Sequence, residues 1–108
     1  MLKIGVIGCG TIGKEICRAI DSKIIKARLA AVFDKNEDNC KRLIGTLDTG
    51  TKIAAPDELI VVSDIVVECA SQSAVRDIGP RVLERGKHLM VMSVGALMDE
   101  VLLENLIS

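Results

Sequence analysis

Continuous apolar runs alternate with apolar stripes of helical spacing along this chain. A short apolar run that ends at a glycine or a turn residue is typical of a strand buried in a parallel sheet. Such runs predict strands at 2–8, 28–33, 51–55, 64–70 and 88–94, the third of them weak and at an edge. Stripes of helical spacing, with one short helical turn among them, begin at Ile12, Cys40, Pro56, Ala74 and Leu97, the last running to Ile107. Because alternating strands and helices need crossover connections, the pattern predicts an α/β fold with a parallel sheet between two helical layers.

The same periodicity predicts the surroundings of a few single side chains. Ile12 shares an apolar stripe with Ile16, so we expect both to face the sheet. Met90 and Met92 alternate along the last predicted strand, where a buried parallel strand would use them to fill the core. Glu68 lies inside an apolar strand, where an unpaired charge is costly. Its carboxylate either lies beside a bound ligand at the end of the sheet or pairs with a base.

Composition excludes several classes of protein for this chain. With 108 residues, 49% of them hydrophobic, and a net charge of −1, we expect one folded domain over residues 1–108 and no disorder. No stretch approaches the roughly 20 apolar residues of a membrane span. Nucleic acid is not an expected partner, because 14 basic residues are balanced by 15 acidic ones and Phe33 is the single aromatic residue.

Four cysteines are scattered through the sequence at Cys9, Cys17, Cys40 and Cys69. They form no C-x-x-C pair, and His88 is the one histidine, so the spacing predicts no metal site. We interpret them as reduced core residues of a cytoplasmic protein, in keeping with the absence of a signal-peptide pattern before the first strand. Cys9 is expected to pack inward, although a thiol at a helix N-terminus can have a lowered pKa.

A glycine motif follows the first predicted strand. Residues 8–13 read Gly-Cys-Gly-Thr-Ile-Gly and match G-x-G-x-x-G between a buried strand and an amphipathic helix. Gly8 permits the tight turn, Gly10 lets a pyrophosphate approach, and Gly13 lets the helix pack close to the strand. Thr11 and Ile12 would supply free backbone amides to the anion. The motif predicts a dinucleotide-binding Rossmann-type, doubly wound sheet of strand order 3-2-1-4-5.

An acidic residue stands where such a site needs one. Asp34 follows the second predicted strand, where a carboxylate accepts hydrogen bonds from the ribose diol of adenosine and repels a 2′-phosphate. Its neighbour Lys35 could instead neutralise that phosphate. We therefore expect NAD as the cofactor, with NADP still possible.

Three segments resemble the L-aspartate dehydrogenases of archaea and bacteria, which are relatives of the homoserine dehydrogenases. They are 2–13 (LKIGVIGCGTIG), 66–75 (VVECASQSAV) and 86–97 (GKHLMVMSVGAL). The resemblance implies that the glycine loop residues Gly8, Gly10, Thr11, Ile12 and Gly13 bind the pyrophosphate and that Asp34 binds the ribose. It also implies that the nicotinamide half lies beside Ala70, Ser71, Gln72, Ser93, Val94 and Gly95.

The resemblance further implies an oxidoreductase that converts L-aspartate, through iminoaspartate, to oxaloacetate and ammonia with NAD(P), the imine feeding NAD biosynthesis. It covers only the first half of the usual family length, so the C-terminal catalytic domain is absent from this chain and no catalytic residue is identified in it. His88 does not correspond to the family's catalytic histidine. Two other interpretations stay open, namely a stand-alone NAD(H)-sensing module and a relic that folds without function. The substrate is given by the resemblance alone, and a homoserine dehydrogenase-like enzyme is the alternative, since no residue here distinguishes aspartate from homoserine or another small acid. We expect self-association, as a dimer, through apolar surfaces that a second half would cover.

Overall fold

The structure is a computed structural model that describes residues 1–92. Strands and helices alternate strictly in this part of the chain. The strands are β1 (Lys3–Ile7), β2 (Arg28–Phe33), β3 (Lys52–Ile53), β4 (Ile65–Glu68) and β5 (His88–Val91). The helices are α1 (Thr11–Asp21), α2 (Glu37–Ile44), α3 (Pro56–Val62) and α4 (Gln72–Glu84). Within residues 1–92, no helix has the length and apolar character needed to cross a bilayer.

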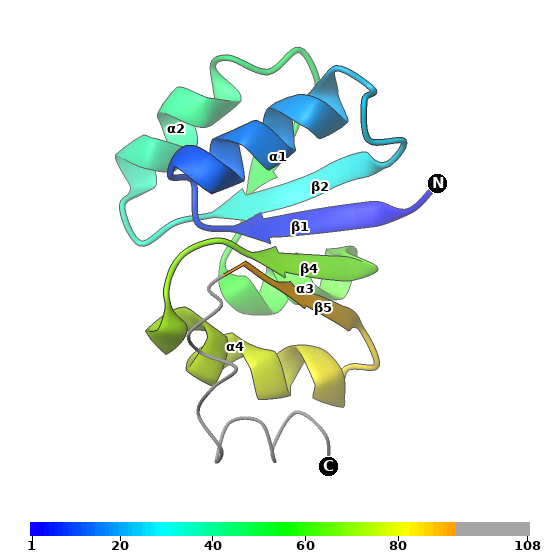
Figure 1. Cartoon of the computed structure of the whole chain (residues 1–108), viewed down its shortest axis with the longest axis vertical. Coiled ribbons are helices and arrows are strands. Elements are labelled where there is room, and N and C mark those ends of the chain that lie inside the picture. The colour runs from blue at the N-terminus through cyan, green and yellow to red at the C-terminus, as the bar shows by residue number, and fades with distance from the viewer. Residues whose placement is uncertain (93–108) are drawn as a thin grey trace.

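The five strands form one parallel sheet in the order β3-β2-β1-β4-β5. The strand order predicted from the glycine motif and the alternating pattern is therefore confirmed. The chain leaves β1 towards β2 on one side and later enters β4 on the other, so the order reverses between β1 and β4. The carboxyl ends of all five strands meet at the same edge of the sheet, as the arrowheads in Figure 1 show.

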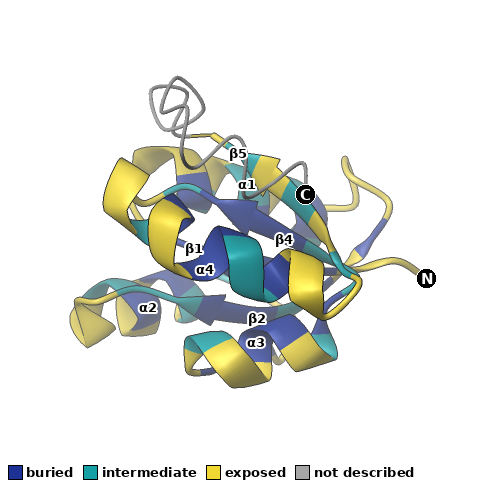
Figure 2. Cartoon of the chain, turned by 90° about the horizontal axis from the view of Figure 1, so that it is seen from below, coloured by how far each residue is buried: buried dark blue, intermediate teal, exposed yellow. Residues whose placement is uncertain are grey.

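Helices cover both faces of the sheet and create two separate cores. Val6 of β1 and Val67 of β4 face α1 and α2, and they pack with Cys17 and Leu43 from those helices. The opposite core contains Ile7 and Val66 from the strands and Leu59, Ile60, Ile78 and Val82 from α3 and α4. Figure 2 shows the buried strands behind α4, and the outward sides of α3 and α4 are exposed. This is the α/β/α arrangement that the sequence pattern predicts.

Three apolar side chains do not lie where periodicity places them. The predictions that Ile12 faces the sheet and that Met90 and Met92 fill the core are wrong, since the three are 49%, 53% and 37% exposed. The methionines are exposed because no helix within residues 1–92 packs on their face of β5. On that side of the sheet α1 lies over β1 and β2, and Leu89 of β5 packs on the opposite side, against α4. The end of the predicted strand 88–94 and the predicted helix from Leu97 lie outside the described residues.

Candidate functional site

A cavity of about 340 Å³ opens at the carboxyl edge of the sheet, around the reversal point between β1 and β4. Its walls come from the ends of β1 and β2, the loops that follow β1, β2 and β4, the start of α3 and the first two turns of α4. The lining residues are Ile7, Gly8, Gly10, Phe33, Asp34, Lys35, Pro56, Cys69, Ala70, Ser71, Ser73, Ala74, Asp77 and Ile78. Ligands of open α/β sheets bind in this kind of crevice.

The glycine loop between β1 and α1 forms the floor of the cavity, and two of its glycines are required by packing. Gly8 has a φ of 101°, and a Cβ there would lie 2.7 Å from the backbone nitrogen of Ala70. A Cβ on Gly13 would lie 1.8 Å from the carbonyl oxygen of Gly8. At Gly10, by contrast, a Cβ would meet nothing within 4 Å. The protein's own packing therefore accounts for Gly8 and Gly13, whereas Gly10 borders open space inside the site.

The N-terminus of α1 faces this open space with free backbone amides. Its N-cap, Gly10, provides no side-chain hydrogen bond, and the first intrahelical bond is donated by the Lys14 amide to the Gly10 carbonyl at 2.9 Å. The amides of Thr11, Ile12 and Gly13 therefore have no intrahelical acceptor, and the helix dipole makes this end electropositive. These three residues form the first turn of α1 and do not line the cavity itself.

Asp34 stands at the end of β2 and connects that strand to the glycine loop. Its Oδ2 accepts a hydrogen bond from the Cys9 amide at 2.7 Å, and its Oδ1 accepts one from the Asn36 amide at 2.9 Å. A carboxylate has about four lone-pair sites, so both oxygens keep acceptor capacity for a ligand. Asp34 and Lys35 both line the cavity, as do Gly8 and Gly10, so the structure brings these four predicted residues together.

The loop after β4 is held by the buried carboxylate of Glu68. Its Oε2 accepts hydrogen bonds from the amides of Ala70 and Ser71, both at 2.7 Å. Glu68 thus fixes the loop that lines the cavity, a role that neither interpretation from the sequence included. Charge-assisted bonds of this kind are about twice as strong as neutral ones, which explains a fully buried carboxylate in an apolar strand.

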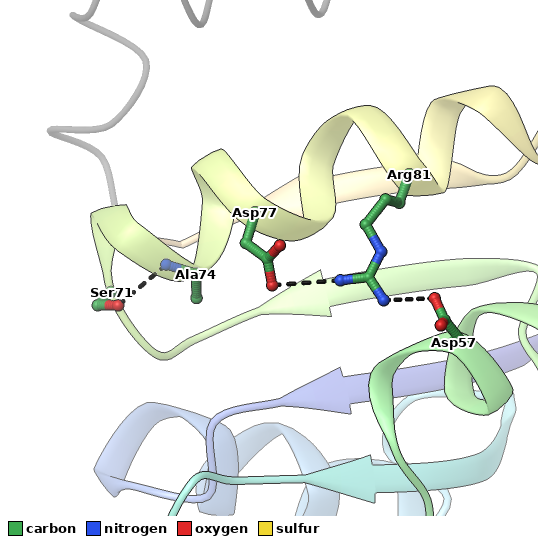
Figure 3. A network of polar contacts seen from close by, with 5 residues as sticks. All are labelled: Asp57, Ser71, Ala74, Asp77 and Arg81. Atoms are coloured by element: carbon green, nitrogen blue, oxygen red, sulfur yellow. Dashed lines mark hydrogen bonds and ion pairs between the residues drawn. The ribbon is translucent and has the colours of Figure 1, made fainter.

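Ser71 has a structural role in addition to its place on the wall. It is the N-cap of α4, and its Oγ accepts a hydrogen bond from the Ala74 amide at 3.1 Å (Figure 3). Ala70 and Ser71 line the cavity, whereas Gln72 begins α4 and does not line it. The predicted site residues Ser93 and Gly95 lie outside the described residues, as does Val94.

The wall formed by α4 was missed by sequence reasoning. Ser73, Ala74, Asp77 and Ile78 all line the cavity. They recur at helical spacing after Ala70, which is the signal that could have found them. Pro56, at the start of α3, lines the cavity opposite them and was not predicted either.

Arg81 ties α4 to α3 beside this wall. Its Nη1 donates a hydrogen bond to Asp77 Oδ2 at 3.2 Å, and its Nη2 forms an ion pair with Asp57 Oδ1 (Figure 3). The hydrogen bond from Arg81 lowers the pKa of the Asp57 carboxyl below its usual range. In return, the bond to Asp57 raises the pKa of Arg81. The bridge therefore favours the charged form of Asp57 and connects α4 to α3.

The cysteines gather behind the glycine loop as free thiols. Cys9, Cys17 and Cys40 are buried, and the sulfur atoms of Cys9 and Cys40 are 3.6 Å apart. Burial raises the pKa of Cys17 to about 12 and that of Cys69 to about 11, and it also raises the pKa of Cys9. The inward packing of Cys9 is confirmed, and its thiol is not activated by the helix N-terminus. In residues 1–92, no group of side chains is arranged to hold a metal ion.

A glycine loop at an open helix N-terminus, an acid at the end of β2 and a crevice at the reversal of strand order define a dinucleotide-binding domain of the Rossmann type. Comparison with known families agrees with this class. The family model described as "Homoserine dehydrogenase, NAD binding domain" matches residues 8–108. The chain belongs to this family, and its cofactor is NAD.

Relatives of known name narrow the relationship further. L-aspartate dehydrogenase of Methanocella arvoryzae is 42% identical over 106 residues, which is 98% of this chain and 39% of the relative. L-aspartate dehydrogenase of Methanosarcina mazei is 51% identical over 107 residues, 98% of this chain and 40% of the relative. This chain thus spans about two fifths of the length of these relatives. The solved scyllo-inositol dehydrogenase of Lactobacillus casei with bound NAD(H) and scyllo-inositol, at 20% identity, shares the fold, with a TM-score of 0.73 over 97% of this chain and 34% of that one.

Proposed function

We propose that this chain is the cofactor-binding part of an enzyme that oxidises L-aspartate with NAD to iminoaspartate, which water then converts to oxaloacetate and ammonia. The observation that carries the proposal is the open space beside Gly10. No neighbouring atom in the protein requires glycine at this position, whereas a ligand at the N-terminus of α1 would. Identity of 42–51% to L-aspartate dehydrogenases supports this substrate over homoserine.

Each part of the dinucleotide can be assigned to residues at the carboxyl edge of the sheet. Gly10 would leave room for the pyrophosphate, and the free amides of Thr11 and Ile12 would donate hydrogen bonds to it. Asp34 would accept hydrogen bonds from the hydroxyls of the adenosine ribose. Ala70, Ser71 and Gln72 would contact the nicotinamide half, whereas Ser93 and Gly95 are assigned to it by resemblance and lie outside the described residues.

Bound NAD supplies the chemistry by accepting a hydride from the amine-bearing carbon of the substrate. The described part of the chain binds and orients the cofactor: Glu68 holds one loop, and Asp34 holds the other. No histidine in residues 1–92 lines the cavity, since His88 begins β5. Acid–base groups and a clamp for the substrate carboxylates are therefore assigned to a catalytic domain that follows in the complete enzyme, as the length of the relatives supports.

Self-association is proposed for the face of β5 that no described helix covers. Met90 and Met92 are exposed on this face, and neighbouring exposed apolar side chains suit contact with another surface. We propose that a second copy of the chain binds to this face. The same dimer would be expected if the chain were a stand-alone NAD-binding module.

Titration with NADH and with NADPH, followed by nicotinamide fluorescence, tests the cofactor proposal. The absence of Trp and Tyr from the chain removes protein emission that would interfere. We expect saturable binding with a preference for NADH, because Asp34 repels a 2′-phosphate. Binding of neither nucleotide at millimolar concentration would refute the proposal.

Two variants of Asp34 separate recognition from loop structure. Asp34→Asn removes the charge but keeps an oxygen that can accept from the Cys9 amide, so we expect the preference for NADH to fall by about tenfold or more. Asp34→Ala also releases the loop and should weaken both nucleotides. Asp38→Asn, on the first turn of α2 and outside the cavity wall, is the matched control and should change neither affinity. An unchanged preference in Asp34→Asn would show that this carboxylate does not contact the ribose.

A further inference from the structure

The wall of the cavity beyond Asp34 is apolar except for a few polar side chains. Pro56, Ala74 and Ile78 provide apolar surface there, which suits a flat heterocycle. If the ribose lies at Asp34, as the proposed function holds, the base attached to it extends into this part of the cavity, away from the glycine loop. The inference below rests on that proposed function.

One carboxylate stands on this wall in a fixed position. Asp77 lines the cavity from the second turn of α4, and its Oδ2 accepts from Arg81 Nη1 at 3.2 Å. Arg81 is itself held by Asp57 on α3, so the guanidinium cannot swing away without breaking an ion pair (Figure 3). The positive charge of Arg81 offsets that of Asp77, which lets a carboxylate stand close to an anionic dinucleotide. The lone pairs of Asp77 that Arg81 does not use remain available to a donor in the cavity.

The three polar side chains on this wall differ in what they can distinguish. Lys35 only donates hydrogen bonds, so it cannot accept from an amine. The hydroxyl of Ser73 both donates and accepts, so it rotates to suit either partner. Asp77 only accepts while it is ionised, and it therefore favours an amine and repels a carbonyl oxygen. Of the three, Asp77 alone favours a 6-amino purine over a 6-oxo purine.

We propose that Asp77 is a specificity residue that reads the base of the dinucleotide, accepting a hydrogen bond from the exocyclic amine of adenine. Arg81 is a positioning residue that aims this carboxylate, and Asp57 anchors Arg81. The site thereby prefers adenine dinucleotides over dinucleotides whose purine carries oxygen at the same position.

The test compares NADH with reduced nicotinamide hypoxanthine dinucleotide, which carries an oxygen in place of that amine and a hydrogen on the neighbouring N1. We expect the unmodified chain to bind NADH about tenfold more tightly, the value of one hydrogen bond to a charged group that is lost and replaced by repulsion. Asp77→Asn should bind the two dinucleotides about equally, because an amide turns its donor towards the oxygen. Asp77→Ser is a second variant with the same expectation, and far-UV circular dichroism confirms that each variant is folded.

Glu84→Gln is the matched control. It removes a carboxylate from the same helix, outside both the cavity wall and the Asp57–Arg81–Asp77 bridge, so the preference for NADH should persist. Equal binding of both dinucleotides by the unmodified chain, or an undiminished preference in folded Asp77→Asn, would overturn the role of Asp77 and leave the proposed function standing. Binding of neither dinucleotide by the unmodified chain would refute the proposed function and this inference together.

Discussion

Alanine at Gly13 should lower stability and alanine at Gly10 should weaken cofactor binding, although the two glycines belong to one motif. A Cβ at Gly13 meets the Gly8 carbonyl oxygen at 1.8 Å, and a backbone atom cannot rotate away as a side chain would. Overpacking costs about 1–3 kcal/mol, and a backbone clash belongs at the upper end, so we expect Gly13→Ala to lower the free energy of unfolding by about 3 kcal/mol. For a domain of this size that is a fall in Tm of about 12 °C or more.

Gly10→Ala is the matched substitution in the same loop. Its φ of −79° suits any L-residue, and the added methyl meets nothing within 4 Å, so the change in stability should stay below about 1 kcal/mol, the usual loss at an N-cap. The methyl would occupy the space assigned to the pyrophosphate and should weaken NADH binding by about tenfold or more. Urea unfolding followed by far-UV circular dichroism, together with the NADH titration, measures both effects. Equal stability losses in the two variants would refute the division of roles, and undiminished NADH binding by Gly10→Ala would remove the pyrophosphate from this position.

Two further predictions concern the thiols and the uncovered strand. An unfolded thiol ionises near pH 9.0, whereas Cys17 in the folded protein ionises near 12, so the unfolded state holds fewer protons above pH 9 and stability falls as the pH rises. At pH 10 this thiol should lower the free energy of unfolding by about 1.4 kcal/mol. Urea unfolding between pH 8 and 10 should therefore show a smaller loss of stability in Cys17→Ala than in the unmodified chain. Equal losses of stability in the two proteins would contradict this prediction. Separately, size-exclusion chromatography over a concentration series should show a dimer that Met90→Lys shifts towards the monomer, with Lys87→Met as a control for charge. A purely monomeric chain at all concentrations would refute self-association through β5.

The order of the strands and the position of the cavity could be predicted because they depend on local signals. A buried strand that ends in glycines next to an amphipathic helix places β1 and α1, and the alternating pattern then leaves few topologies. Asp34 could be located because it directly follows the second apolar run. The exposure of Met90 could not be predicted, because periodicity identifies an apolar face without saying what covers it.

Contacts between distant parts of the chain account for what was missed in the site. The bridge from Asp57 through Arg81 to Asp77 joins residues up to 24 positions apart, and each looks like an ordinary surface charge in the sequence. The role of Glu68 was ambiguous for the same reason. Its Oε2 accepts from backbone amides, and no pattern of residue types reveals such partners. Backbone donors and long-range ion pairs become visible only once the helices and loops are placed in space.

The bond between Asp34 and the Cys9 amide has a consequence for how this site could change its cofactor. In many dinucleotide sites, admission of a 2′-phosphate starts with loss of the acid that follows the second strand. Here that loss would also remove the acceptor for the Cys9 amide and release the loop that is to hold the pyrophosphate. A route to NADP therefore needs either a replacement that still accepts from the Cys9 amide, as asparagine can, or a second substitution that supplies a new acceptor. A single change to a residue without a side-chain acceptor would give a protein that binds both cofactors poorly. Selectivity and loop structure depend on one carboxylate, which restricts the single substitutions that can change the preference and still keep the loop.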